Sequence, residues 1–204
     1  CLAGFATHGL IDACTTYGTV LFWPFSDTRI AWSIISIIDP IFTLGVILGL
    51  IFSIARSSLP IAFLTLLFGL FYLLFGFYQN QRVQAEVYQI AMERNHAVER
   101  IFVKPSFGNL IVWRTVYLHE NRFYVDAIRA GRELRKFNGG SVKRFNINVV
   151  SESLKIPTLQ LYDLRRFNWF TSNMLGISEI YSNRVIDVRY SMLPNGLDPI
   201  WYLE

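Results

Sequence analysis

Three polar residues near the start of the chain, His8, Asp12 and Asp39, are the side chains best suited to chemistry. They interrupt a very apolar run, where a polar group is costly unless it has a partner or a task. His8 and Asp12 are four residues apart, so on a helix they lie on one face, one turn from each other. An imidazole and a carboxylate at that spacing can bind a divalent metal ion, with further ligands from other helices.

On this hypothesis His8 and Asp12 are metal ligands. Asp39 is then a further ligand or the catalytic base for a metal-bound water. A simpler interpretation stands beside it, in which His8 is a core histidine hydrogen-bonded to Asp12 and Asp39 only caps a helix. The spacing alone leaves both open.

The remaining candidates are weaker. His96 is predicted on a solvated, charged helix and His119 at the tip of a hairpin, so neither is predicted to be catalytic. The sequence contains no GxSxG, Walker A, glycine-rich dinucleotide or CxxC motif. The two cysteines, Cys1 and Cys14, do not make a disulfide framework.

The composition indicates a membrane protein with a more polar second half. Of 204 residues, 52% are hydrophobic and 17% are charged, below the roughly 25% usual in soluble domains. Residues 1–78 hold two basic and three acidic residues, whereas residues 79–204 hold 17 basic and 12 acidic ones. We therefore predict a membrane-embedded helical region over 1–78, a connecting amphipathic helix over 79–104 and a soluble α+β domain over 105–204.

The strongest structural signal is residues 59–78, which contain no charge. At about 1.5 Å per residue, a helix of this length just crosses a hydrocarbon core of about 30 Å. The apolar run 41–55 precedes it, with Asp39 as predicted N-cap and Pro40 at the first helical position. A turn at residues 56–58 makes 40–78 a predicted helical hairpin, whose first arm is longer if residues 34–38 continue the helix.

The segment before the hairpin is predicted to form a buried helix over residues 1–16. Residues 17–30 are predicted to be a loop or an interfacial segment, with aromatic side chains at the level of the lipid headgroups. The chain opens directly in hydrophobic sequence at Cys1, and we expect part of the protein to precede it.

The second half alternates in a pattern typical of an α+β domain. A helix over residues 82–100 is expected to end at Pro105. Strands 111–118 and 122–128 are predicted to form a hairpin around 119–121. The other elements expected are a strand over 142–150, a helix over 158–172 with Leu161, Leu164 and Phe167 on one face, and short strands over 177–181, 184–190 and 200–203.

A basic run over residues 129–144 surrounds Asn138-Gly139-Gly140. It is either attracted to acidic lipid headgroups or is an ordinary solvated, flexible surface. Nucleic acid is not an expected partner, because no binding motif accompanies the charges. The excess of Arg29, Arg82 and Arg94 over Arg56 near the membrane places the C-terminal domain in the cytoplasm by the positive-inside rule.

The chain resembles a bacterial family of predicted metal-dependent hydrolases of the inner membrane, the YdjM-like family. The resemblance rests on ordered blocks: Thr7-His8 with Asp12, Thr15-Thr16-Tyr17-Gly18, Trp23-Pro24-Phe25-Ser26, Ile38-Asp39-Pro40, Asn109 to Trp113-Arg114, and Asp187 with Arg189-Tyr190. It implies a multi-pass inner-membrane protein in which His8 and Asp12 are metal ligands and Asp39 the next candidate. The family also resembles, distantly, the all-helical zinc-dependent phospholipase C and single-strand nuclease superfamily. An upstream histidine block of the family is absent here, so we expect the rest of the site to lie before Cys1.

Two functions are therefore expected from different classes. The first is a metal-dependent hydrolase of the bacterial inner membrane, with a divalent ion such as zinc and a phosphoester or lipid-like substrate. The second is a non-catalytic, membrane-anchored structural or regulatory protein whose basic C-terminal domain binds a partner or acidic lipid.

Overall fold

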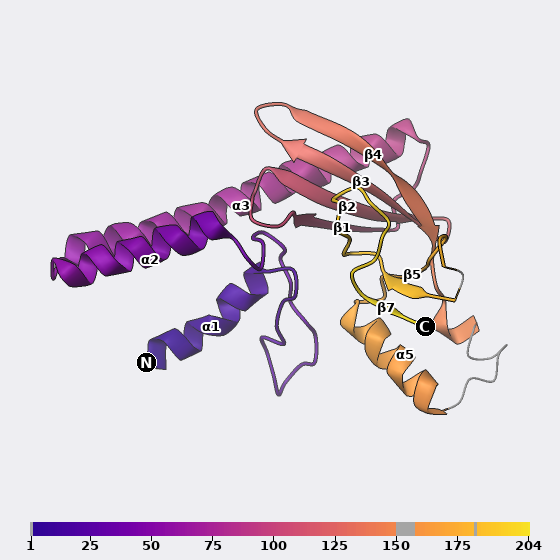
Figure 1. Cartoon of the computed structure of the whole chain (residues 1–204), viewed down its shortest axis with the longest axis horizontal. Helices are drawn as coiled ribbons and strands as arrows, with labels where there is room; N and C mark the ends of the chain where they lie inside the picture. Colours follow the sequence, from indigo (N-terminus) through magenta and orange to yellow (C-terminus); the bar gives the residue numbers. More distant parts are fainter. Residues whose placement is uncertain (1, 150–157, 182) are drawn as a thin grey trace. The chain divides into compact units, whose positions relative to one another are not determined.

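The computed structural model describes residues 2–149, 158–181 and 183–204 (Figure 1). The chain divides into two compact units. Unit 1 comprises Cys1–Glu86, Val103–Trp113 and Arg129–Arg135, and unit 2 comprises Val87–Phe102, Arg114–Ile128 and Lys136–Glu204. A helical N-terminal region is followed by small β-sheets, as the sequence predicts.

Three helices form the N-terminal region: α1 (Leu2–Cys14), α2 (Pro40–Ala55) and α3 (Leu59–Glu93). The predicted start of α2 is confirmed, since Asp39 is its N-cap and Pro40 lies at its first position. Residues 34–38 do not extend α2, because the chain there is not helical. The predicted burial of the first helix is wrong for most described side chains: Ala13 and Cys14 are buried, but Leu10 and Ile11 are almost half exposed.

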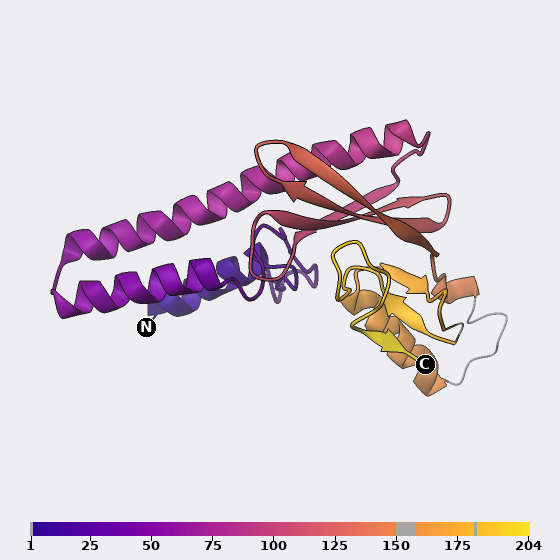
Figure 2. The same ribbon diagram turned by 45° about the horizontal axis from the view of Figure 1, so that its top comes forward.

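Two glycines of α2 lie against α3. A Cβ atom added at Gly45 would collide with the Phe68 ring, and one added at Gly49 would collide with Thr65. Figure 2 shows the two helices alongside each other, joined by a short connection. Glycine at this four-residue spacing lets the backbones of two helices approach closely.

The small apolar cluster of unit 1 is formed by Cys14, Ile34 and Ile35, with Phe42, Tyr72 and Leu73 packed against it. The backbone at Ile34 lies so close to α3 that a Cβ atom at Gly76 would collide with the Ile34 carbonyl oxygen. Within residues 34–38, predicted as a possible extension of α2, Ile34 and Ile35 instead pack the loop against α3.

The long helix α3 includes both the apolar run 59–78 and part of the amphipathic segment predicted after it. It ends at Glu93 rather than at residue 100, and Asn95 takes the left-handed conformation, with φ 56°. The prediction that Pro105 ends this helix is therefore wrong. Pro105 is the last residue of strand β1 (Arg100–Pro105).

Strand β1 belongs to a four-stranded sheet in the order β1-β2-β3-β4, with β2 (Val112–His119), β3 (Arg122–Ala130) and β4 (Leu134–Lys143). The predicted β2–β3 hairpin is confirmed. Its turn residues Glu120 and Asn121 both have positive φ, 44° and 63°, as a two-residue turn of right-handed twist requires.

The predicted strand over 142–150 is mostly wrong, because the strand is β4 and ends at Lys143. Residue 150, the last of that prediction, lies outside the described residues. Gly139 suits β4 for a steric reason. A Cβ atom there would collide with the carbonyl oxygens of Val125 and Asn195. In the sequence this glycine is typical of a loop. In the structure it lies within a strand, where two neighbouring backbone segments leave no room for a side chain.

The rest of unit 2 contains α5 (Thr158–Phe170) and a second sheet in the order β5-β6-β7. Its strands are β5 (Leu175–Ile177), β6 (Val185–Asp187) and β7 (Tyr202–Leu203). The helix predicted over 158–172 is confirmed and ends at Phe170. The strands predicted over 184–190 and 200–203 are present but shorter, whereas the one predicted over 177–181 is replaced by β5, which ends at Ile177.

The core of unit 2 joins residues of both sheets. Its buried members are all apolar: Val116, Leu118, Phe123, Val125, Val142, Met174, Ile186 and Val188. Because the first four lie on β2 and β3 and Ile186 lies on β6, the two sheets share one core.

Candidate functional site

The pair His8 and Asp12 lies on one face of α1, as the four-residue spacing predicts. The Nε2 atom of His8 is 3.3 Å from Oδ2 of Asp12. The exposed fractions of the two side chains are 74% and 44%, so they are not part of a protein core. Because both side chains are exposed, a ligand can reach the imidazole and the carboxylate at the same time.

Asp39 is buried and has a different set of partners. Its Oδ1 atom accepts hydrogen bonds from the backbone N–H groups of Ile41 and Phe42, each at 3.1 Å. The hydroxyl group of Tyr72 on α3 lies 2.9 Å from both carboxylate oxygens. The side chain therefore joins the start of α2 to the middle of α3, and its burial is compensated by these bonds.

The structure thus brings together two of the three predicted site residues. None of the bonds recorded for Asp39 involves His8 or Asp12. In the part of the chain that the structure describes, no three His, Cys, Asp or Glu side chains gather as a metal-binding group. A catalytic zinc site has three protein ligands and a water molecule, so His8 and Asp12 alone do not complete one.

Two polar residues, Gln79 and Asn80, follow the apolar run of α3 directly. In the structure they bind backbone carbonyl groups of unit 1. Buried Gln79 donates to the carbonyl oxygen of Ala130 at 2.7 Å, and buried Asn80 donates to that of Ser33 at 3.2 Å. Gln79 thus joins α3 to the end of β3, and Asn80 joins it to the loop before α2. No local sequence pattern predicts these roles.

In unit 2, His96 and His119, neither of which is predicted to be catalytic, lie together. The rings of His96 and His119 stack with centroids 4.3 Å apart. His96 Nδ1 is 2.9 Å from the Tyr117 hydroxyl oxygen, and His119 Nδ1 is 3.1 Å from the carbonyl oxygen of Ala97. Desolvation, followed by the neighbouring His119 and Arg94, lowers the pKa of His96 below its usual value.

Arg94 holds the segment after α3 to the sheet within unit 2. Its two terminal nitrogens bind the Asp126 carboxylate at 2.7 and 2.9 Å, and this bidentate pair raises the pKa of the arginine. Asp126 also accepts from the Gly139 backbone N–H at 3.1 Å. The contact joins residues more than 30 positions apart, which sequence patterns do not reveal.

Two further arginines are buried in unit 2. Arg114 donates to backbone carbonyl oxygens, and burial lowers its pKa to about 10. Arg189 forms a buried ion pair with Asp187 at 2.7 Å. Polar groups that are satisfied internally in this way are typical of structural rather than catalytic roles. The carbonyl groups that accept from Arg114 are those of Val188, Leu193, Pro194 and Gly196.

Comparison with known proteins finds a family match for the N-terminal region. Residues 1–83 match the YdjM inner membrane protein family, and this span includes α1, α2, the loop between them and the apolar part of α3. The match confirms the resemblance stated from the sequence, and it supports association with the inner membrane. It ends before the blocks at Asn109–Arg114 and Asp187–Tyr190. No curated protein and no solved structure matches the chain.

Proposed function

We propose that this is a multi-pass inner-membrane protein anchored by a hairpin of α2 and α3, with its C-terminal unit in the cytoplasm. The observation that carries the proposal is the exposure of α2 and of the apolar part of α3, residues 59–78. No residue of α2 is buried, and α3 exposes large apolar side chains such as Leu59 and Phe71, 85% and 74% exposed. Among the described residues, α3 is the one helix long and apolar enough to cross a membrane by itself.

Exposed apolar surface on this scale favours lipid over water. Such surface costs about 25 cal/mol for each Å² in water, and two helices covered with it are stable only in lipid or against a partner. At about 1.5 Å per residue, the 16 residues of α2 extend about 24 Å, short of a typical hydrocarbon core. Local thinning of the bilayer compensates for such a mismatch at modest cost.

Extraction of native membranes tests this anchor. After washing with alkaline carbonate and with urea, the protein is expected to stay in the membrane pellet and to dissolve only in detergent. A variant with Leu66→Arg and Leu70→Arg on α3 is expected to be lost from the pellet, because a charge at the bilayer centre is costly. Release of the unaltered protein by carbonate would contradict the proposal.

A second candidate function, metal-dependent hydrolysis, is favoured by the His8–Asp12 pair. We propose that these two groups bind a divalent ion such as zinc, together with ligands from outside the described residues. His8 and Asp12 would hold the ion, and the ion would supply Lewis-acid chemistry for the hydrolysis of a phosphoester or a lipid-like substrate. His8 offers its imidazole nitrogen and Asp12 its carboxylate, and their exposure leaves room for the substrate.

The contacts of Asp39 restrict its part in this second proposal. To ligate a metal or act as a base, the carboxylate would have to release the Tyr72 hydroxyl group or the two backbone N–H groups that it now accepts. The arrangement favours the helix cap as its role, with His8 and Asp12 as the ligands.

Elemental analysis of the intact purified protein distinguishes these roles. The protein is expected to retain stoichiometric metal, and His8→Ala or Asp12→Asn is expected to remove it. Asp39→Asn, the matched control, is expected to keep the metal, since asparagine also caps helices. Full metal occupancy in both the His8 and the Asp12 variants would exclude the site, and a metal-free protein would favour the non-catalytic, membrane-anchored alternative.

A further inference from the structure

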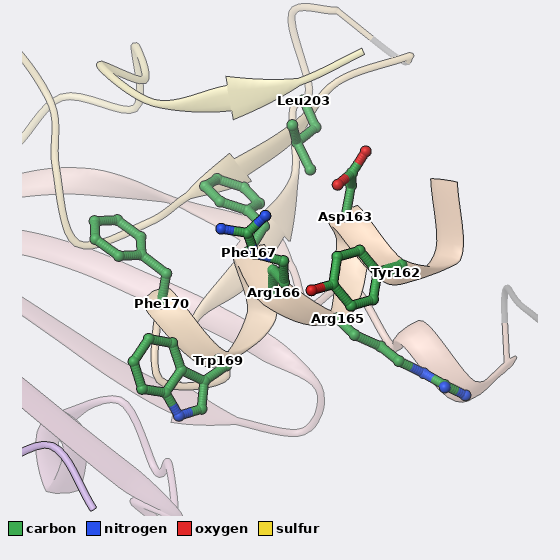
Figure 3. A pocket seen from close by; sticks show the side chains of 8 residues that line it. All are labelled: Tyr162, Asp163, Arg165, Arg166, Phe167, Trp169, Phe170 and Leu203. Carbon is green, nitrogen blue, oxygen red and sulfur yellow. The ribbon is translucent and has the colours of Figure 1, made fainter. Parts of the chain in front are cut away.

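Helix α5 and strand β7 border a cavity of about 670 Å³ in unit 2 (Figure 3). Four of its eight lining residues are aromatic, namely Tyr162, Phe167, Trp169 and Phe170. Leu203 of β7 also lines it. The cavity belongs to neither the His8–Asp12 pair nor the α2–α3 anchor.

The exposed side of α5, called its outer face, carries large apolar side chains as well as charges. Leu159, Tyr162 and Trp169 follow one another at helical spacing, and their exposed fractions are 72%, 58% and 53%. Phe167, in contrast, is half-buried. An exposed patch of large apolar side chains beside a cavity marks a contact surface.

The charges on this helix indicate what the surface contacts. Arg165 and Arg166 follow each other between Tyr162 and Trp169, and only Asp163 opposes them. The Arg166 guanidinium group lies 5.6 Å from the centre of the Tyr162 ring, and Figure 3 shows it among the aromatic side chains. Arg165 extends away from them. Neither arginine has a salt bridge with a described residue, so both cations are available to an anion.

We propose that the outer face of α5 docks on the surface of an anionic phospholipid bilayer. Arg165 and Arg166 bind lipid phosphate groups, Tyr162 and Trp169 lie at the headgroup level, and Leu159 enters the acyl boundary. Tryptophan, tyrosine and arginine are the residues that membrane interfaces favour, and a helix of this composition binds in the interface plane. The attraction grows with each cation near the anionic surface and falls with salt.

The inference rests on the proposed membrane anchor, because the anchor holds α5 at a high local concentration relative to the bilayer. The two proposals fail in distinguishable ways. If the anchor is absent, the protein does not enter a lipid nanodisc. If only the α5 contact is absent, the protein enters the nanodisc but α5 remains as exposed as it is in detergent.

Hydrogen–deuterium exchange of the full chain in nanodiscs provides the test. We compare nanodiscs of phosphatidylcholine alone with nanodiscs containing about 30% phosphatidylglycerol, an anionic lipid. The amides of residues 159–170 are expected to exchange at least several-fold more slowly in the anionic nanodiscs. Arg165→Gln with Arg166→Gln is expected to abolish the difference, and about 0.5 M salt to reduce it. The matched control, Arg132→Gln with Arg135→Gln, removes two cations from unit 1 and is expected to keep it.

Equal exchange in the two kinds of nanodisc would overturn the proposal. Slow exchange that depends on protein concentration and not on lipid charge would also overturn it, since a second copy of the chain would then cover α5. Slower exchange in the anionic nanodiscs that persists in the Arg165 and Arg166 double variant would contradict the assigned role of the two arginines.

Discussion

At the scale of single residues, two carboxylates in the same apolar run have different roles because they have different partners. Asp39 and Asp12 both interrupt an apolar run, but Asp39 is buried with three hydrogen-bond donors and Asp12 is open beside His8. Because Asp39 is buried, its carboxylate oxygens need hydrogen-bond donors. The backbone N–H groups at the start of α2 and the Tyr72 hydroxyl group provide them. The difference depends on a contact between residues 33 positions apart, which the sequence does not display.

A substitution at Asp39 tests the cap. Asp39→Ala leaves two backbone N–H groups and the Tyr72 hydroxyl group without their acceptor, and we expect a loss of about 1–2 kcal/mol of stability. Asp39→Asn keeps an acceptor oxygen and is expected to lose less. Thermal unfolding of detergent-solubilised protein measures both. Equal stability of the alanine variant and the unaltered protein would show that the cap contributes nothing.

The stacked His96 predicts a pH dependence with a defined sign. The pKa of His96 is lowered by desolvation and by the positive neighbours His119 and Arg94, whereas Glu120 opposes the shift. The rings of Tyr117 and Tyr124 pack against the imidazole. The folded state therefore favours neutral His96. As the pH falls below about 6.5, the unfolded chain takes up the proton first, so stability decreases over the interval down to the lowered pKa.

Histidine NMR titration checks this directly. His96 is expected to titrate below the ordinary histidine value of about 6.5. The His119→Gln variant is expected to raise the pKa of His96, because it removes a positive neighbour. An unchanged titration midpoint in that variant would mean that burial, not His119, determines the shift.

At the scale of elements, the sequence predicts a helix or strand correctly where local properties alone determine that element. The apolar run 59–78 and the Asp39-Pro40 start were found because length, charge and capping chemistry are local properties. The β4 strand was misplaced because its glycines and basic residues disfavour a strand locally, and pairing with β3 overrides them. The stacking of His96 on His119 is not predictable from local sequence, because it depends on how segments distant in the chain pair.

The packing of α2 on α3 is tested by a pair of alanine variants. Gly49→Ala places a methyl group into Thr65, whereas the matched Gly69→Ala places one in ordinary contact, 3.8 Å from the Phe42 ring. Both changes favour helix formation equally, so their difference isolates the packing. We expect Gly49→Ala to lower the stability in detergent by about 1–3 kcal/mol relative to Gly69→Ala. Equal melting temperatures would contradict the close approach of the helices.

At the scale of the whole molecule, the chain combines a helical region whose exposed surface is apolar with a β-rich region that has its own apolar core. The family match covers the first part and supports its association with the membrane. The candidate site was predictable as a pair, because His8 and Asp12 share one helix. Whether further ligands complete a metal site was not predictable. Ligands from other segments are brought together by tertiary contacts, and the spacing of residues along one helix does not reveal those contacts.

The proposed hairpin of α2 and α3 crosses the bilayer twice, which places its turn on one side of the membrane and the C-terminal unit on the other. Labelling by a membrane-impermeant maleimide, in cells with a permeabilised outer membrane, tests this topology most directly. The variants are Ser57→Cys in the turn and Glu120→Cys in unit 2, with the parent chain as background. We predict that the Ser57→Cys variant is labelled in intact cells and that the Glu120→Cys variant is labelled only after the inner membrane is broken. Labelling of both variants in intact cells, or of neither, would contradict the hairpin.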